Sequence, residues 1–176
     1  MITGIDLSEK NGEVEWNDFG FGDVQFVFIK ATEAIDSVDR DFERNLLRSK
    51  ELGIITGAYH WLHPRLHVGQ QAELFINTVK SFKGLLPPIV CLETHHANLD
   101  ENDKNVKTYL PKAEWGCDYL LWLDNPGTIW PQQLWPWAGW TFWQYSYQAR
   151  LPGIPTNLGL NYFNGSKTEL QQMVIQ

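Results

Sequence analysis

Short runs of β-branched, aliphatic and aromatic residues recur along the chain and predict strands. Several of these runs are continuously apolar, which is typical of strands that are buried on both faces. The predicted strands cover residues 2–6, 25–30, 54–62, 88–93, 119–124, 139–145 and 158–163.

Stretches with helical periodicity separate some of the predicted strands. Residues 41–52 have mixed charge and end before a glycine, a residue that often follows the last turn of a helix. Residues 68–82 repeat apolar side chains at steps of three and four, so they predict a helix with one apolar face. Ser166 and Glu169 have the spacing of a capping box, so residues 166–176 predict a short closing helix.

The alternation of strands and helices predicts parallel strands that are joined by right-handed crossovers. Seven short strands in one domain favour a closed or nearly closed β/α barrel. An open doubly wound sheet is the alternative, and it usually carries a glycine-rich phosphate-binding turn after its first strand. Here Gly4-Ile5-Asp6 is followed by Leu7-Ser8 without that motif, so we expect an α/β protein of the barrel type.

Length and composition narrow the classes of protein. A chain of 176 residues fits one domain over residues 1–176. The net charge of −7 argues against a nucleic-acid-binding protein and against docking to acidic membranes. No apolar run is long enough to span a membrane, and the first residues lack the order of a signal peptide. With 9 Trp, 9 Phe and 6 Tyr, the chain needs either a thick core or a surface for stacking.

The cysteines and histidines give no clear metal motif. Cys91 and Cys117 can form one disulfide or remain as two reduced thiols, and the second interpretation is favoured. His95 and His96 follow Cys91 closely, but the chain has no CxxC motif and no zinc-like spacing of Cys and His. We therefore expect no metal site and no cofactor.

Polar and aromatic residues close most of the predicted strands, where the reacting groups of β/α barrels lie. These residues are Asp6, Lys30, Glu33, Tyr59, His60, Trp61, Glu93, Asp124, Gln144 and Tyr145. Aromatic rings stack on the apolar faces of sugars, and a pair of carboxyl groups does acid–base work on a glycosidic bond. The combination therefore predicts a carbohydrate site.

Structural roles are alternatives for several of these residues. Asp6 can cap the turn that follows it, and Asp124 is favoured as the first residue of a turn. Tyr59 and His60 can equally be polar residues of the core.

Glu93 is the strongest candidate for a general acid. It follows a buried apolar run, and such surroundings favour the protonated form of a carboxyl group. It can also be an ion-pair partner of Lys30, although Glu33 is favoured as the partner of that lysine.

Several motifs occur in the order of one known family. The matching pieces are residues 4–8 (GIDLS), 26–33 (FVFIKATE), 57–61 (GAYHW), 87–93 (PPIVCLE), 143–146 (WQYS) and 160–165 (LNYFNG). With these motifs the chain resembles the glycoside hydrolase family 25 muramidases, the lysozymes of many phages and bacteria. The resemblance covers residues 2–93 almost continuously and residues 119–165 more loosely.

The resemblance implies a modified β/α barrel that cleaves the β-1,4 bond between N-acetylmuramic acid and N-acetylglucosamine in peptidoglycan. It implies that Glu93 is the general acid and that Asp6 lines the same catalytic site. The residues expected to bind the substrate are Tyr59, His60, Trp61, Cys91, Trp143, Gln144, Tyr145 and Asn161. The implied partner is the glycan strand of peptidoglycan, and we expect a monomer. A chain without a signal peptide fits a phage lysin in the host cytoplasm or a virion component that acts on the cell wall.

Three departures from the family pattern bear on activity. Cys91 stands two residues before Glu93, and Gly159 stands two residues before Asn161, at positions where the family has aspartates. Strand alternation puts positions 91 and 93 on one face, so Cys91 is expected to point into the site. The segment from Glu93 to Leu121 is shorter than in the family, which predicts an incomplete barrel with a reduced late wall.

These departures leave several functions open. The chain can be an active or impaired muramidase, a peptidoglycan-binding protein without activity, or a hydrolase of another glycan such as chitin. A thiol nucleophile at Cys91, with a neighbouring histidine as base, is disfavoured. Part of the tryptophan cluster, including Trp115, Trp130 and Trp135, is expected to be local core beside the shortened segment.

Overall fold

The computed structural model describes residues 1–18, 22–63, 65–91, 118–124, 126–127 and 137–176. Its elements, in chain order, are β1 (Ile2–Leu7), η1 (Glu9–Asn11), β2 (Val24–Glu33), β3 (Ser37–Val38), α1 (Phe42–Glu51), β4 (Ile55–Trp61), α2 (Val68–Val79), β5 (Ile89–Cys91), β6 (Trp122–Asp124), β7 (Phe142–Ala149), β8 (Leu158–Phe163) and α4 (Lys167–Gln172). Each of the seven predicted strands overlaps an observed strand, whereas the short β3 was not predicted.

One sheet connects all the described strands, in the order β5-β4-β2-β1-β8-β7-β6, with β3 paired to β2. The pairs β1–β2, β2–β4, β4–β5 and β6–β7 are parallel, as predicted. The prediction of parallel strands is wrong for β8, which runs antiparallel to both β1 and β7. Residues 150–157, which join β7 to β8, contain no helix, and a crossover to a parallel strand usually needs a longer, helical connection.

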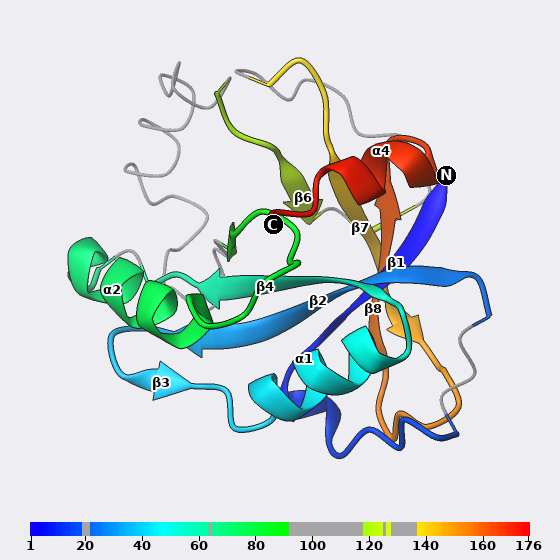
Figure 1. Ribbon diagram of the computed structural model, residues 1–176, viewed down its shortest axis with the longest axis horizontal. Coiled ribbons are helices and arrows are strands. Elements are labelled where there is room, and N and C mark those ends of the chain that lie inside the picture. Colours follow the sequence, from blue (N-terminus) through cyan, green and yellow to red (C-terminus); the bar gives the residue numbers. More distant parts are fainter. Residues whose placement is uncertain (19–21, 64, 92–117, 125, 128–136) are drawn as a thin grey trace.

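The sheet curls into a nearly closed barrel, with β5 and β6 at the two ends of the strand order (Figure 1). The ring centroids of Phe28 in β2 and Trp122 in β6 are 4.8 Å apart, and Tyr59 in β4 lies 5.7 Å from the same Trp122. Because β6 is not adjacent to β2 or β4 in the sheet, these contacts cross the barrel interior. The predicted modified β/α barrel is therefore confirmed.

The strand β2 shows why its sequence is continuously apolar. Val27 and Ile29 pack in a cluster with residues of α1 and α2 outside the barrel. Phe26 and Phe28 point the other way, into an interior cluster with residues of β4, β7, β8 and α4. Both faces of the strand are thus buried, and a large part of the aromatic content forms the barrel interior. Trp115, Trp130 and Trp135 lie outside the described residues.

The helix ends follow the local sequence. After α1, Gly53 adopts a φ of 75°, which glycine tolerates without steric cost. The backbone N–H of Gly53 donates to the carbonyl of Lys50 and closes the helix. Before α4, the Ser166 hydroxyl accepts from the backbone N–H of Glu169, and the Glu169 carboxylate accepts from the backbone N–H of Ser166, as the predicted capping box requires. No helix among the described residues is long and apolar enough to cross a membrane.

Candidate active site

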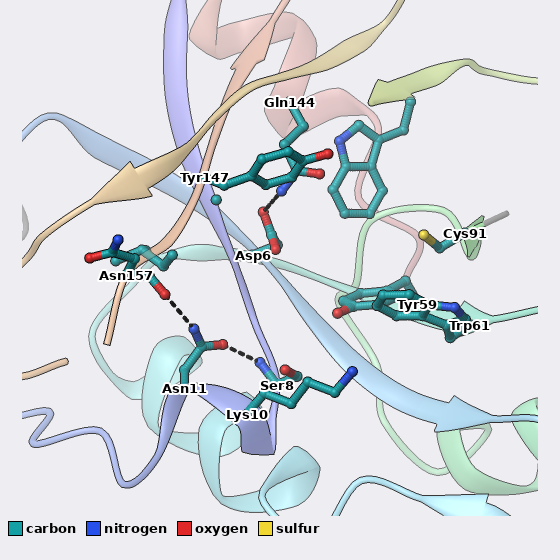
Figure 2. Close-up of a pocket in the computed structure, with 13 residues that line it drawn as sticks. Asp6, Ser8, Lys10, Asn11, Tyr59, Trp61, Cys91, Gln144, Tyr147 and Asn157 are labelled. Atoms are coloured by element: carbon teal, nitrogen blue, oxygen red, sulfur yellow. Dashed lines mark hydrogen bonds between the residues drawn. The ribbon is translucent and has the colours of Figure 1, made fainter. Parts of the chain in front are cut away.

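A cavity of about 300 Å³ opens where β1, β4, β5 and β7 carry their predicted site residues (Figure 2). The described residues that line the cavity are Asp6, Ser8, Lys10, Asn11, Tyr59, Trp61, Cys91, Trp122, Gln144, Tyr147, Asn157, Leu158 and Gly159. Five predicted site residues are among them, which are Asp6, Tyr59, Trp61, Cys91 and Gln144. Polar side chains and aromatic rings from distant parts of the chain thus converge as the sequence predicted.

Two side-chain amides hold the Asp6 carboxylate. Gln144 Nε2 donates to Asp6 Oδ1 at 2.7 Å (Figure 2), and Asn161 Nδ2 donates to the same oxygen at 2.8 Å. The oxygen of the Asn161 amide accepts in turn from Trp122 Nε1 at 2.8 Å. Asn161 is completely buried, so it positions Asp6 from behind the cavity wall. Two N–H donors on one oxygen stabilise the charged carboxylate and orient it.

Gly159 belongs to the same arrangement, because β8 places it beside Asp6 in the strand register. A Cβ atom at this position would lie 2.0 Å from Asp6 Oδ1 and 2.1 Å from Gln144 Nε2. The Asp6 carboxylate and the Gln144 carboxamide therefore together occupy the space that a larger residue at position 159 would need. We call Asp6, Gln144, Gly159 and Asn161 the amide side of the cavity.

The opposite part of the cavity is formed by Tyr59, Trp61 and Cys91, which we call the aromatic side. Tyr59 and Trp61 are two residues apart on β4, so strand alternation turns both toward the cavity (Figure 2). The β4–β5 register pairs Trp61 with Cys91, the last residue of β5. Cys91 is half-buried, and it lines the cavity as predicted.

His60 is not part of the cavity, although it was predicted to bind the substrate. It lies between Tyr59 and Trp61 on β4, so its side chain faces the other way, toward α2. Its Nδ1 pairs with the Thr32 hydroxyl at 2.7 Å, and its Nε2 pairs with Gln71 Oε1 at 3.1 Å. Burial lowers the pKa of His60 and outweighs the hydrogen bond that His60 Nε2 donates to Gln71, which acts in the opposite direction. The alternative interpretation, a polar residue of the core, describes this histidine.

Trp143 and Tyr145 also lie away from the cavity, on the outer face of β7. Tyr145 stacks on Tyr162 with ring centroids 4.0 Å apart, and Trp143 lies 5.9 Å from Tyr145. Burial and the contact with Tyr162 raise the pKa of Tyr145. Ordinary alternation from Gln144, which faces the cavity, turns Tyr145 outward. The register between β7 and β8 then shifts between Gln144 and Ser146, so Tyr147 rather than Ser146 faces the cavity.

Glu33 forms an ion pair with Lys30, as the sequence favoured, and also contacts His63. Its partial burial acts to raise the pKa of the carboxyl group, but the hydrogen bonds and charges of Lys30 and His63 outweigh burial and lower that pKa. Asp124 accepts a hydrogen bond from the Tyr147 hydroxyl at the end of β6.

Several expectations fall on parts of the chain that the structure does not describe. Glu93, Cys117, His95 and His96 lie outside the described residues. Within the described part of the chain, no cluster of three or more His, Cys, Asp or Glu residues could hold a metal ion.

Sequence reasoning missed the part of the wall that follows β1. Ser8, Lys10 and Asn11 reach the cavity because η1 begins directly after the strand, and Asn157 comes from the segment before β8. The Asn11 amide oxygen accepts from the backbone N–H of Ser8 at 2.9 Å, and its amide nitrogen donates to the carbonyl of Asn157 at 3.2 Å (Figure 2). The position of Lys10 three residues after the end of β1 was the available clue in the sequence.

Comparisons with known proteins agree with this geometry. The model of the glycosyl hydrolases family 25 matches residues 5–116. The chain belongs to this family. It is 30% identical over 200 residues to the uncharacterized protein YegX of Escherichia coli (strain K12), covering 98% of this chain and 73% of that protein. It is 26% identical to Lysozyme M1 of Streptomyces globisporus, covering 96% of this chain and 70% of the relative.

Family 25 structures share the fold over nearly the whole chain. The bacterial lysozyme of Streptomyces coelicolor superposes with a TM-score of 0.80 at 24% identity, covering 98% of this chain and 96% of that one. A family 25 glycosyl hydrolase of Bacillus anthracis gives a TM-score of 0.75 at 25% identity, covering 98% and 93%. The alignment to YegX extends over 200 residues, more than the 176 of this chain, so the relative has residues without a counterpart here.

Proposed function

We propose that this family 25 member is a peptidoglycan hydrolase that cleaves the β-1,4 bond between N-acetylmuramic acid and N-acetylglucosamine. The observation that carries the proposal is the Asp6 carboxylate, held by two amides in a cavity with aromatic walls. Relatives of the chain include proteins named as lysozymes and muramidases, which supports the same substrate class.

The cavity has the groups that such a reaction needs. The rings of Tyr59, Trp61 and Trp122 offer apolar faces on which sugars stack. Glu93 is proposed as the general acid that protonates the glycosidic oxygen as the bond to the sugar carbon breaks. The fixed charge of Asp6 stabilises the positive charge that develops on the sugar ring, and water then completes the hydrolysis. Because the amides orient Asp6 before the substrate arrives, little reorganisation is needed during the reaction.

A comparison of wild type with Glu93→Gln tests the proposal. The turbidity of a peptidoglycan suspension should fall with wild type and fall about 10²- to 10⁴-fold more slowly with the variant, because the general acid is lost. Glu73→Gln is a matched control, since Glu73 is exposed on α2. Equal rates for wild type and Glu93→Gln would contradict the assignment of Glu93.

A second candidate function is peptidoglycan binding without catalysis. It is favoured by Cys91, which lines the cavity at a position where the family pattern has an aspartate. A neutral thiol does not stabilise positive charge, and the nearby Gly159 carries no side chain. This candidate predicts that insoluble peptidoglycan retains the protein while no reducing ends are released.

A further inference from the structure

We propose that Lys10 determines specificity by binding a carboxylate group of the glycan at the edge of the cavity. This inference rests on the proposed function, because it concerns a ligand of the same cavity. It adds a charged subsite that recognises an acidic glycan and that a neutral N-acetylglucosamine polymer would leave unused.

The backbone places Lys10 at the cavity. The residue lies in η1, which begins two residues after the end of β1, and its exposed side chain contributes to the cavity wall. Figure 2 shows this side chain extending along the edge of the cavity toward Tyr59 and Trp61. An anion that approached the stacked sugar from this edge would meet the ammonium group.

Trp61 holds the ammonium group of Lys10 in this position. Lys10 Nζ lies 5.0 Å from the centroid of the Trp61 ring, within the range of a cation–π contact. Lys30 Nζ lies at the same distance from the ring, but Lys30 is buried and forms an ion pair with Glu33. One of the two cations at Trp61 is therefore neutralised inside the protein, whereas the other faces the cavity.

The acidic side chains around Lys10 are engaged elsewhere. The carboxylate of its neighbour Glu9 lies 3.7 Å from the Arg40 side chain. Asp39 accepts from the backbone N–H groups of Glu9 and Asp41, at 2.9 and 3.0 Å. Among the described residues, no carboxylate forms an ion pair with Lys10.

The charge of the whole chain makes this local cation significant. A net charge of −7 repels anions, so a carboxylated ligand needs a local positive group to approach the site. Lys10 and Asp6 are the two formally charged residues among the described lining residues. A carboxylate in peptidoglycan has two sources, which are the lactyl group of a muramic acid without a stem peptide and the stem peptide itself where one is attached. Both present the same chemistry to a lysine.

The test measures the affinity for three glycans by titration calorimetry, in a Glu93→Gln background that limits turnover. The glycans are neutral chitotetraose, a peptide-free tetrasaccharide of alternating N-acetylglucosamine and N-acetylmuramic acid, and the same tetrasaccharide with stem peptides. Lys10→Gln should weaken binding of the carboxylated glycans about three- to fivefold, a typical effect of one exposed charge pair, and leave chitotetraose unchanged. Lys10→Arg should retain the affinity for the carboxylated glycans. Lys80→Gln, at the far end of α2, should give the same three affinities as the Glu93→Gln protein alone.

The outcomes separate the two proposals. A loss with the peptide-free glycan alone identifies the lactyl carboxylate, and a loss with the peptide-bearing glycan alone identifies the stem peptide. A loss with both shows that Lys10 accepts a carboxylate from either source. If binding is measurable and Lys10→Gln changes none of the three affinities, or weakens all three equally, the role of Lys10 is wrong while the proposed function stands. A background protein that binds none of the glycans contradicts both proposals.

Discussion

The two sides of the cavity are held in place by different means. On the amide side, Asp6 lies on β1, which has strand partners on both edges, and side chains from β7 and β8 hold its carboxylate. On the aromatic side, Cys91 closes β5, a strand of 3 residues at the end of the described sheet. Hydrogen bonds between side chains hold the amide side in place. The aromatic side depends on its aromatic rings and on the register between β4 and β5.

This difference explains how the chain tolerates two departures from its family pattern. The amide of Gln144 binds Asp6 and lies in the space next to Gly159 that a side chain at position 159 would need. The two residues therefore form one packed unit, and neither can change alone without cost. Cys91 lies on the half-buried edge of the cavity, where replacing a carboxylate alters the charge of the wall and disturbs little packing.

The largest expected effect is on the amide side, at its charged centre. Asp6→Asn preserves the shape of the side chain but removes the charge that we propose stabilises the transition state. We expect the rate of peptidoglycan hydrolysis to fall about 10²- to 10³-fold, as it does when a preorganised electrostatic group is lost. Turbidity assays measure the rate, and Asp23→Asn, at an exposed position, is the control. A variant as active as wild type would remove Asp6 from the mechanism.

Gly159→Ala should disrupt the packed unit that Gly159 forms with Gln144. The new methyl group displaces Asp6 or Gln144 and disrupts a hydrogen bond to a charged group, so we expect a loss of about 2 kcal/mol in unfolding free energy. Thermal unfolding should show a decrease in Tm of about 4–8 °C for a chain of this size.

Two further variants make this prediction specific. Gly139→Ala is the control, since a Cβ atom at Gly139 meets nothing within 4 Å. In a Gln144→Ala background the cost of Gly159→Ala should shrink, because the Gln144–Asp6 hydrogen bond is already lost and Asp6 can move away from the methyl group into the space that the amide leaves. An equal cost in both backgrounds would show that the two residues do not form a unit.

On the aromatic side, Cys91→Asp should increase activity. It returns a carboxylate to the cavity wall, so we expect hydrolysis to become about tenfold faster, equivalent to about 1.4 kcal/mol of transition-state stabilisation. Cys91→Ser is the matched control, because it adds polarity without charge. An unchanged rate in Cys91→Asp would mean that the missing carboxylate does not limit this enzyme.

The smallest expected effect is on the pH dependence of folding stability, and it arises from His60, behind the aromatic side. Burial lowers the pKa of His60 in the folded protein, so the unfolded chain takes up a proton first as the pH falls below about 6.5. Stability should therefore decrease from neutral to mildly acidic pH, by at most about 1.4 kcal/mol per pH unit for one proton. His60→Gln should flatten this dependence in thermal unfolding between pH 7.5 and 5.5. His67→Asn, at the exposed start of α2, should leave it unchanged.

Local patterns in the sequence predicted most of the elements, and the same patterns could not place every side chain. Tyr59, His60 and Trp61 were all expected to bind the substrate, but strand alternation places Tyr59 and Trp61 on one face of β4 and His60 on the other. The sequence does not say which face is the cavity, because both faces of the strand are buried. Tyr147 shows the stronger limit, since a register irregularity after Gln144 turns it toward the site, where regular alternation along β7 would have placed Ser146.

The sequence by itself determined the strands, the helices with their caps, the family and the position of Asp6 at the end of the first strand. These features depend on interactions between residues close in the chain, or on motifs that stand in a fixed order. Only the tertiary structure decided the antiparallel direction of β8, the unit of Gln144 and Gly159, and the place of Lys10 at Trp61. Each of these depends on segments far apart in the sequence that meet when the sheet curls, and no local pattern records such a contact.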